Sequence, residues 1–240
     1  MYFCRNNLNQ LIEYMKILKK DSGRLAIWNL VAPFGFLGIG LILVMSMSYF
    51  KPQEVMAILA GIGALFEVPL FIFFFLYWFK FLIGINRCYK DNAKLMYADI
   101  IGWIAISLRL LMSFIGLMLV IFVVFIKSNH YVSIQFLPSG MYLQGPILQV
   151  SHTVYLIISV LFCVMYLLFM LASERKTAVR TLSLIIVIVQ GSLAFFPMLF
   201  PTLPWIILEI ALAVTTLIFF WEIHRGYVFP SPSKQQELPE

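Results

Sequence analysis

The chain is a series of long apolar runs separated by short polar segments. A helix needs about 20 mostly apolar residues to cross a bilayer. Six runs reach this length, and they cover residues 27–49, 55–79, 97–126, 147–172, 181–200 and 203–223. The third run is longer than a bilayer requires, so we expect this helix to tilt or to protrude. The pattern predicts an all-α polytopic membrane protein with six transmembrane helices.

Residues 6–20 follow a different pattern, because their apolar side chains recur at helical spacing on one face only. The apolar positions are Leu8, Leu11, Ile12, Met15 and Leu18. This predicts an amphipathic helix in the headgroup region, with its lysines facing anionic lipid. A soluble tail helix is the alternative. Asp21, Ser22 and Gly23 are then expected to turn the chain into the first span.

The predicted organisation therefore has three parts. They are a cytoplasmic amphipathic elbow helix over 1–24, a six-helix membrane domain over 25–226 and a cytoplasmic polar tail over 227–240. Within this tail, residues 231–240 have the polarity and the prolines of a disordered segment.

Composition and charge agree with this class. The chain is 62% hydrophobic and 12% charged, whereas a soluble domain is about half apolar and a quarter charged. If the N-terminus is cytoplasmic, all 17 basic residues except Lys51, Arg109 and Lys127 lie on the cytoplasmic side. This positive-inside bias predicts two cytoplasmic termini in a cell membrane, plasma or bacterial inner. It also accounts for the net charge of +6, so this charge does not indicate binding to nucleic acid.

Glu67 lies well inside the second predicted span, and Arg109 lies well inside the third. Buried charges in membranes are paired, face a cavity or serve a function. Glu67 lies about 18 Å below the outer end of its span, and Arg109 lies about 18 Å above the inner end of its span. In an apolar core about 30 Å thick, their levels therefore differ by about one helical turn. We expect a static ion pair. A moving or substrate-contacting role, and no contact at all, are the alternatives.

Two connections between spans are unusual. Residues Lys80–Lys94 form the most charged loop between spans. A role in fixing the orientation of the helices in the membrane would by itself explain these charges. On the other side, Pro197, Pro201 and Pro204 prevent one continuous helix between the fifth and sixth spans. They predict a broken element at the outer face, sheltered by protein. Glu209 follows it, and we favour a headgroup position over a vestibule lining.

The sequence offers little chemistry of its own. His130 and His152 are isolated, so they predict neither a metal site nor a catalytic group. No Gly-x-x-x-x-Gly-Lys-Ser/Thr motif is present, so this chain would not bind nucleotide through a P-loop. We expect no enzyme activity, no metal and no cofactor in this chain.

Several short motifs resemble those of the permease subunits of ABC exporters of the second type. A basic junction, Lys19–Arg24, leads to Pro33 in the first span. Gly191-Ser192 and Phe196-Pro197 close the fifth span, and Leu203-Pro204-Trp205 opens the sixth. The chain departs from the family pattern at Ser22, where proline is commoner, and in the order of Gly191 and Ser192.

The resemblance implies a subunit that forms half of a substrate path with a second copy or a paralogue. ATP and Mg would bind to a separate ATPase subunit. That subunit would press on a coupling helix in the loop, at Arg87, Tyr89, Lys90, Asp91 and Lys94. An outer gate would consist of Phe196, Pro197, Pro201, Pro204, Trp205 and Glu209.

Two other functions stay open. One is a secondary transporter or channel in which Glu67 or Glu209 carries a proton. The other is a structural subunit of a larger membrane complex.

Overall fold

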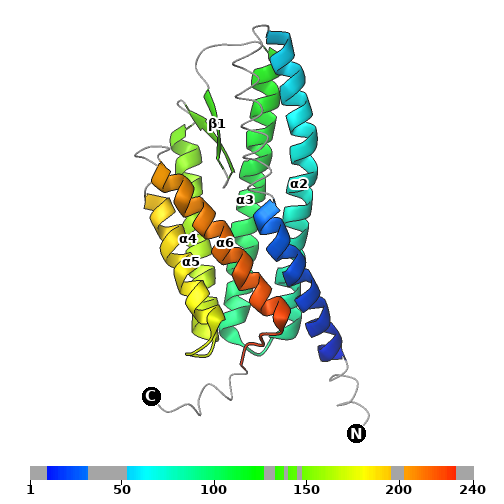
Figure 1. Ribbon diagram of the computed structural model, residues 1–240, viewed down its shortest axis with the longest axis vertical. Coiled ribbons are helices and arrows are strands. Elements are labelled where there is room, and N and C mark those ends of the chain that lie inside the picture. The colour runs from blue at the N-terminus through cyan, green and yellow to red at the C-terminus, as the bar shows by residue number, and fades with distance from the viewer. Residues whose placement is uncertain are drawn as a thin grey trace.

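The computed structural model describes residues 10–31, 53–126, 133–137, 140–144, 148–195 and 203–230, and side chains within 10–31, 69–115, 153–194 and 207–230. Apart from one β-hairpin, the elements of this part are helices that form an elongated bundle (Figure 1). The N-terminal helix covers residues 10–31. The other helices are α2 (Gln53–Cys88), α3 (Ala93–Ile126), α4 (Leu148–Ala172), α5 (Ala178–Phe195) and α6 (Leu203–Arg225).

The length and the apolar composition of the helices are those of membrane-spanning segments. Among the described residues, four helical stretches are long and apolar enough to cross a bilayer, namely Pro69–Cys88, Ala93–Ile115, Thr153–Ala172 and Ile207–Arg225. A fifth apolar stretch, Ala178–Ala194, is shorter. The predominantly helical class is thus confirmed. Most of the first predicted span, 27–49, lies outside the described residues, so the number of six spans stays a prediction.

The hairpin lies between the third and fourth predicted spans, 97–126 and 147–172, and was not predicted. Strands β1 (Ser133–Leu137) and β2 (Gly140–Gln144) pair antiparallel, with Ser133 opposite Gln144 and Leu137 opposite Gly140.

The N-terminal helix is continuous, so the turn expected at Asp21–Gly23 was wrong. The polar residues there are satisfied inside the helix. The Ser22 hydroxyl donates to the Leu18 carbonyl at 2.7 Å, and Asp21 pairs with Arg24 at 3.8 Å. Ser22 is fully buried and Asp21 nearly so, because this face packs on the bundle. The helix therefore runs past the boundary predicted at residue 24.

Helix α2 ends nine residues later than the predicted span. Phe81, Leu82 and Ile85 are each 0% exposed, so they extend its buried face to the last turn. Lys80 lies on the exposed side of the same helix. The loop predicted over Lys80–Lys94 was therefore wrong in extent, and the real connection is Tyr89–Asn92.

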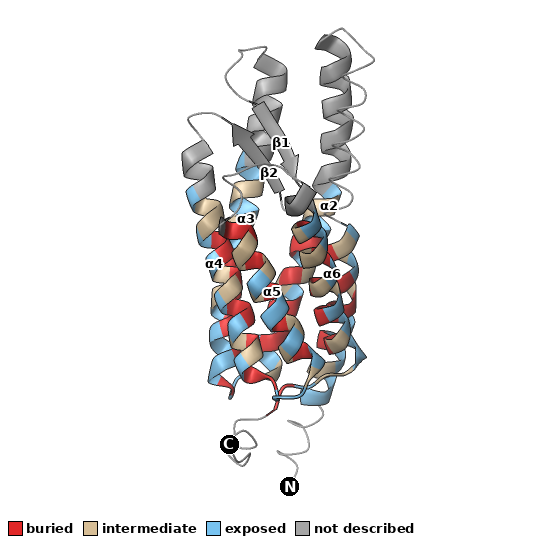
Figure 2. Cartoon of the chain, turned by 60° about the vertical axis from the view of Figure 1, so that its left-hand side comes forward, coloured by how far each residue is buried: buried red, intermediate tan, exposed pale blue. Residues whose placement is uncertain are grey.

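Aromatic side chains fill the centre of the bundle. Trp78 of α2 contacts Phe162 of α4 and Phe220 of α6, with ring centroids 5.8 and 5.2 Å apart. Phe81 and Phe219 extend this cluster, because both contact Phe220, with ring centroids 4.9 and 5.1 Å away. Buried residues lie on the inward faces of the helices and exposed ones on the outside (Figure 2). The apolar outer surface is what lipid-facing helices require.

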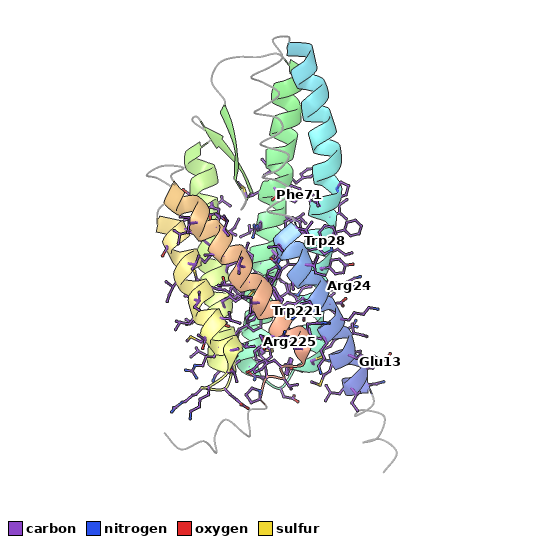
Figure 3. The ribbon with its side chains drawn as sticks, in the orientation of Figure 1. Glu13, Arg24, Trp28, Phe71, Trp221 and Arg225 are labelled. Atoms are coloured by element: carbon purple, nitrogen blue, oxygen red, sulfur yellow. The ribbon has the colours of Figure 1, made fainter. Side chains whose placement is uncertain are left out.

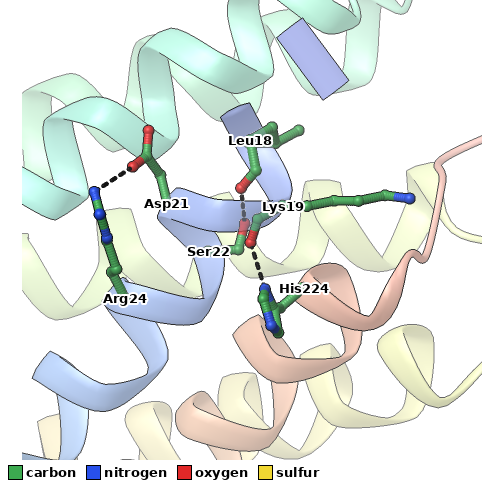
Figure 4. Close-up of polar contacts among 6 residues, drawn as sticks. All are labelled: Leu18, Lys19, Asp21, Ser22, Arg24 and His224. Carbon is green, nitrogen blue, oxygen red and sulfur yellow. Dashed lines mark hydrogen bonds and ion pairs between the residues drawn. The ribbon is translucent and has the colours of Figure 1, made fainter. Parts of the chain in front are cut away.

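Two glycines let the N-terminal helix approach its neighbours. A Cβ on Gly84 of α2 would lie 2.8 Å from Leu18, and one on Gly23 would lie 2.7 Å from His224 Nδ1 of α6. His224 donates through this nitrogen to the Lys19 carbonyl at 2.7 Å (Figure 4). Gly23 thus makes room for the ring that joins α6 to the N-terminal helix.

We expect Gly23→Ala to destabilise the protein by about 1–3 kcal/mol, because the imidazole ring must move and its bond to Lys19 is lost. Gly191→Ala is the matched control. No atom lies within 4 Å of a Cβ at Gly191 in helix α5, so the better helix propensity of alanine should be neutral or stabilising. Thermal unfolding in mild detergent measures both. Equal melting temperatures would show that the two helices do not pack closely at Gly23.

Candidate functional site

One end of the bundle gathers the charged connections, and we call it the basic end. It consists of the connection 89–92, the connection 173–177 and the C-terminal segment 226–230. Arg87 lies in the last turn of α2 and Lys94 in the first turn of α3, on either side of the exposed Lys90 and Asp91. A connection of four residues has no room for a helix of its own. The expected separate coupling helix was therefore wrong, although its charged residues do lie together.

The C-terminal segment begins with a turn that only glycine adopts easily. Gly226 has φ of +119°. Its N–H donates to the Ile223 carbonyl at 3.1 Å, and the Tyr227 N–H donates to the Glu222 carbonyl at 3.2 Å. This pair of bonds is a Schellman C-cap. It ends helix α6 and turns the chain back under the bundle.

Phe229 anchors this segment. Its side chain is 2% exposed and lies 5.4 Å from the Tyr89 ring and 5.7 Å from the Phe169 ring, centroid to centroid. Its backbone N–H donates to the Tyr89 hydroxyl at 3.3 Å. Burial raises the pKa of Tyr89 to about 12, so this hydroxyl stays neutral near pH 7. The polar tail predicted from residue 227 was therefore wrong for residues 227–230, and residues 231–240 lie outside the described ones.

Hydrogen bonds join the three parts of the basic end. Asn92 caps helix α3 by accepting from the Leu95 N–H at 3.4 Å, and its amide donates to the Pro230 carbonyl at 3.3 Å. The Glu174 N–H donates to the Tyr227 hydroxyl at 3.4 Å. These bonds link the C-terminal segment to both connections.

A further bond links the two connections through their flanking helices. Lys94 Nζ, in the first turn of α3, donates to the Leu171 carbonyl of α4 at 3.0 Å. The two connections and the C-terminal segment are therefore joined to one another by hydrogen bonds.

Arg109 lies in the middle of the bundle. Its guanidinium is over the rings of Phe74 in α2 and Phe162 in α4, at 5.3 and 5.8 Å from their centroids. Such stacking holds a planar cation between two helices. Glu67 precedes Phe74 by seven residues, about 10 Å along α2. The side chain of Glu67 lies outside the described residues, so its pairing with Arg109 stays a prediction.

Asp99 lies at the start of the third predicted span, where the sequence indicates a contact with Lys94 or with the headgroups. Its carboxylate instead accepts a hydrogen bond from the Asn86 amide of α2 at 2.9 Å, and the residue is 1% exposed. The sequence could not show this pairing because Asn86 seemed to belong to a loop, whereas it lies in α2.

A second polar pair inside the bundle was also missed. The Gln190 amide of α5 donates to the Ser159 hydroxyl of α4 at 3.1 Å, and both residues are buried. In the sequence, each partner stands out only as a polar residue in an apolar run, and this is the signal that could have indicated the pair. Bonds of this kind hold membrane helices together.

The predicted outer gate is mostly outside the described residues. Phe196, Pro197 and Pro201 belong to the undescribed stretch 196–202. Pro204 and Trp205 lie in the first turn of α6, with side chains that are not described. Glu209 is 4% exposed, so it faces the inside of the bundle, and its position relative to the headgroups stays a prediction.

Metal chemistry has no support among the described residues, where no three His, Cys, Asp or Glu side chains come together. Comparison of the chain with protein-family models, curated proteins and solved structures found no match.

Proposed function

We propose that the chain is the transmembrane permease subunit of an ATP-driven exporter, with ATP and Mg bound by a separate ATPase subunit. In this proposal six helices cross the membrane, both termini are cytoplasmic and the basic end faces the ATPase. The motif resemblance and the positive-inside bias support it.

The observation that carries the proposal is the construction of the basic end. A motor subunit can do work only on a surface that transmits displacement to the helices above it. Here Lys94 ties α3 to α4, and Phe229 packs against both Tyr89 and Phe169. A push on the connection 89–92 would therefore move α2, α3 and α4 together.

The short connection changes where the ATPase would bind. Without a separate coupling helix, the contact surface would be the ends of α2 and α3 themselves. Arg87, Lys90 and Lys94 are exposed there, and they fit an acidic groove on the partner.

The polar groups inside the bundle are a second observation in favour of a transport function. Polar groups at Arg109 and at Gln190–Ser159 lie well inside α3, α4 and α5. Arg109 lies about 24 Å from the first residue of α3, a distance that places it near the middle of a bilayer. Intramembrane polar groups at this depth are typical of transport proteins.

The test is purification of the tagged chain from its own membranes in mild detergent, followed by photolabelling with azido-ATP. We expect a second polypeptide that is labelled and that ATP protects. Charge reversal in Arg87→Glu with Lys90→Glu should reduce its recovery about tenfold or more, because two interfacial charges become repulsive.

The matched control is Lys16→Glu with Lys20→Glu, which changes the net charge equally on the exposed face of the N-terminal helix. This control should retain the labelled polypeptide. A chain that carries no labelled partner, or two double variants that lose it equally, would contradict the proposal.

Asp99 favours a second candidate, a proton-linked transporter that works without an ATPase. A carboxyl group that is 1% exposed and accepts a hydrogen bond from the Asn86 amide inside the bundle is typical of a proton carrier. Proton flux into liposomes that contain this chain alone, abolished by Asp99→Asn, would favour this function over the first.

A further inference from the structure

Two cations from different helices converge on one aromatic ring at the outer surface of the bundle. Arg24 of the N-terminal helix lies 5.7 Å from the Tyr77 ring centroid, and Lys80 of α2 lies 5.3 Å from it. The Arg24 side chain is 43% exposed, and Lys80 is also exposed. Because both cations contact the same ring, their long side chains can reach a single anion.

The acidic residues nearby do not balance this charge. Asp21 contacts Arg24 at 3.8 Å, but its side chain is only 9% exposed. Residues 69–88 of α2 contain no acidic residue. Lys20, one turn before Arg24, is exposed and adds further positive charge. The face therefore has a net positive charge.

An exposed apolar surface begins directly beside the two cations. Trp28 stacks on Phe73 at 5.2 Å and on Tyr77 at 6.4 Å. Ile27, Phe73 and Leu76 are 52%, 42% and 39% exposed. In Figure 3, Arg24, Trp28 and Phe71 follow one another along the same edge of the bundle, away from the basic end. Charge and apolar surface are thus arranged like the headgroup and the chains of a lipid.

The depth of the cations suits a headgroup. Lys80 lies eight residues before the end of α2, about 12 Å from the basic end. Helix α2 has 36 residues, so it is about 54 Å long and exceeds a whole bilayer of about 40–45 Å. Part of α2 must protrude, and the long Lys80 and Arg24 side chains can reach the phosphate level.

We propose that this face binds one anionic phospholipid. Its phosphate lies between Arg24 and Lys80 over Tyr77, and its acyl chains lie along Trp28, Phe73 and Leu76. A free phosphate would use the cations alone, and the adjoining apolar surface favours the lipid. In the proposed topology the basic end is cytoplasmic, so the lipid belongs to the inner leaflet.

Native mass spectrometry of the purified full chain tests this site. The protein is incubated with phosphatidylglycerol or phosphatidylcholine at equal concentration, and the bound fraction is counted. We expect one phosphatidylglycerol per chain in preference to phosphatidylcholine. Arg24→Gln with Lys80→Gln should lower its retention about tenfold or more.

The control is Arg175→Gln with Lys176→Gln, which removes the same charge from exposed positions at the basic end. This control should retain the lipid. Lys80→Gln alone should give an intermediate loss of lipid retention. The melting temperature of each variant is measured to check that it is folded.

Three outcomes would overturn the site: equal retention of both lipids, equal loss in the two double variants, or displacement of the lipid by inorganic phosphate. The last would identify the occupant as a free anion.

Discussion

Replacing Phe229 with alanine should lower the free energy of unfolding by about 3–5 kcal/mol. This side chain is 2% exposed, and it is the main apolar contact of the C-terminal segment with Tyr89 and Phe169. Its loss also weakens the backbone bond from residue 229 to the Tyr89 hydroxyl, because the segment loses its main apolar contact with the bundle. Unfolding by SDS titration in mixed micelles measures the change.

The neighbouring residue provides the control. Val228 is 45% exposed, so Val228→Ala should change the stability by no more than about 0.5 kcal/mol. If both variants unfold at the same SDS concentration, the C-terminal segment does not belong to the folded bundle.

The second large effect is expected at Trp78, in the centre of the aromatic cluster. Its side chain is 2% exposed and contacts Phe81, Phe162 and Phe220. Trp78→Ala should therefore cost about 3–5 kcal/mol, through lost contacts and the cavity that remains. The same SDS titration gives the value.

Trp78→Phe separates packing from polarity. The indole Nε1 is buried and finds no hydrogen-bond partner among the described residues, which costs about 1–3 kcal/mol. Phenylalanine keeps much of the ring contact and removes this group. We expect Trp78→Phe to lose less than half as much stability as Trp78→Ala. Equal losses would indicate that the indole N–H does make a bond.

The sequence predicted the bounds of a helix well where polar residues directly follow its apolar run. The fourth run was expected over 147–172 and α4 covers Leu148–Ala172. The sixth was expected over 203–223 and α6 covers Leu203–Arg225. In both cases charged or polar residues follow the apolar run directly, so hydrophobicity alone places the boundary well.

The sequence failed where tertiary contacts override local signals. Lys80 and Gly84 indicated a loop, but α2 continues because Phe81 and Ile85 are buried against other helices. Gly23 indicated a turn, but it serves the close approach of His224, which lies 201 residues away in the chain. Contacts between distant segments leave no mark in a local pattern.

The candidate site shows the same limit. The charged residues Arg87 and Lys90 could be identified from their density between two spans. Phe229 could not, because it seemed part of a tail and its partner Tyr89 is 140 residues away. Gly226 after a basic helix end, followed by two aromatic residues, is the signal that would have indicated an ordered segment.

The most direct test of the proposed function is crosslinking from the basic end in intact cells. A photoreactive amino acid is placed at Lys90, and another at Ile157, which is 47% exposed on α4. We expect position 90 to form a light-dependent adduct with a polypeptide that binds ATP, and position 157 to form none. If position 90 crosslinks only to lipid, or to no ATP-binding polypeptide, the basic end is not the site of an ATPase and the proposed function is wrong.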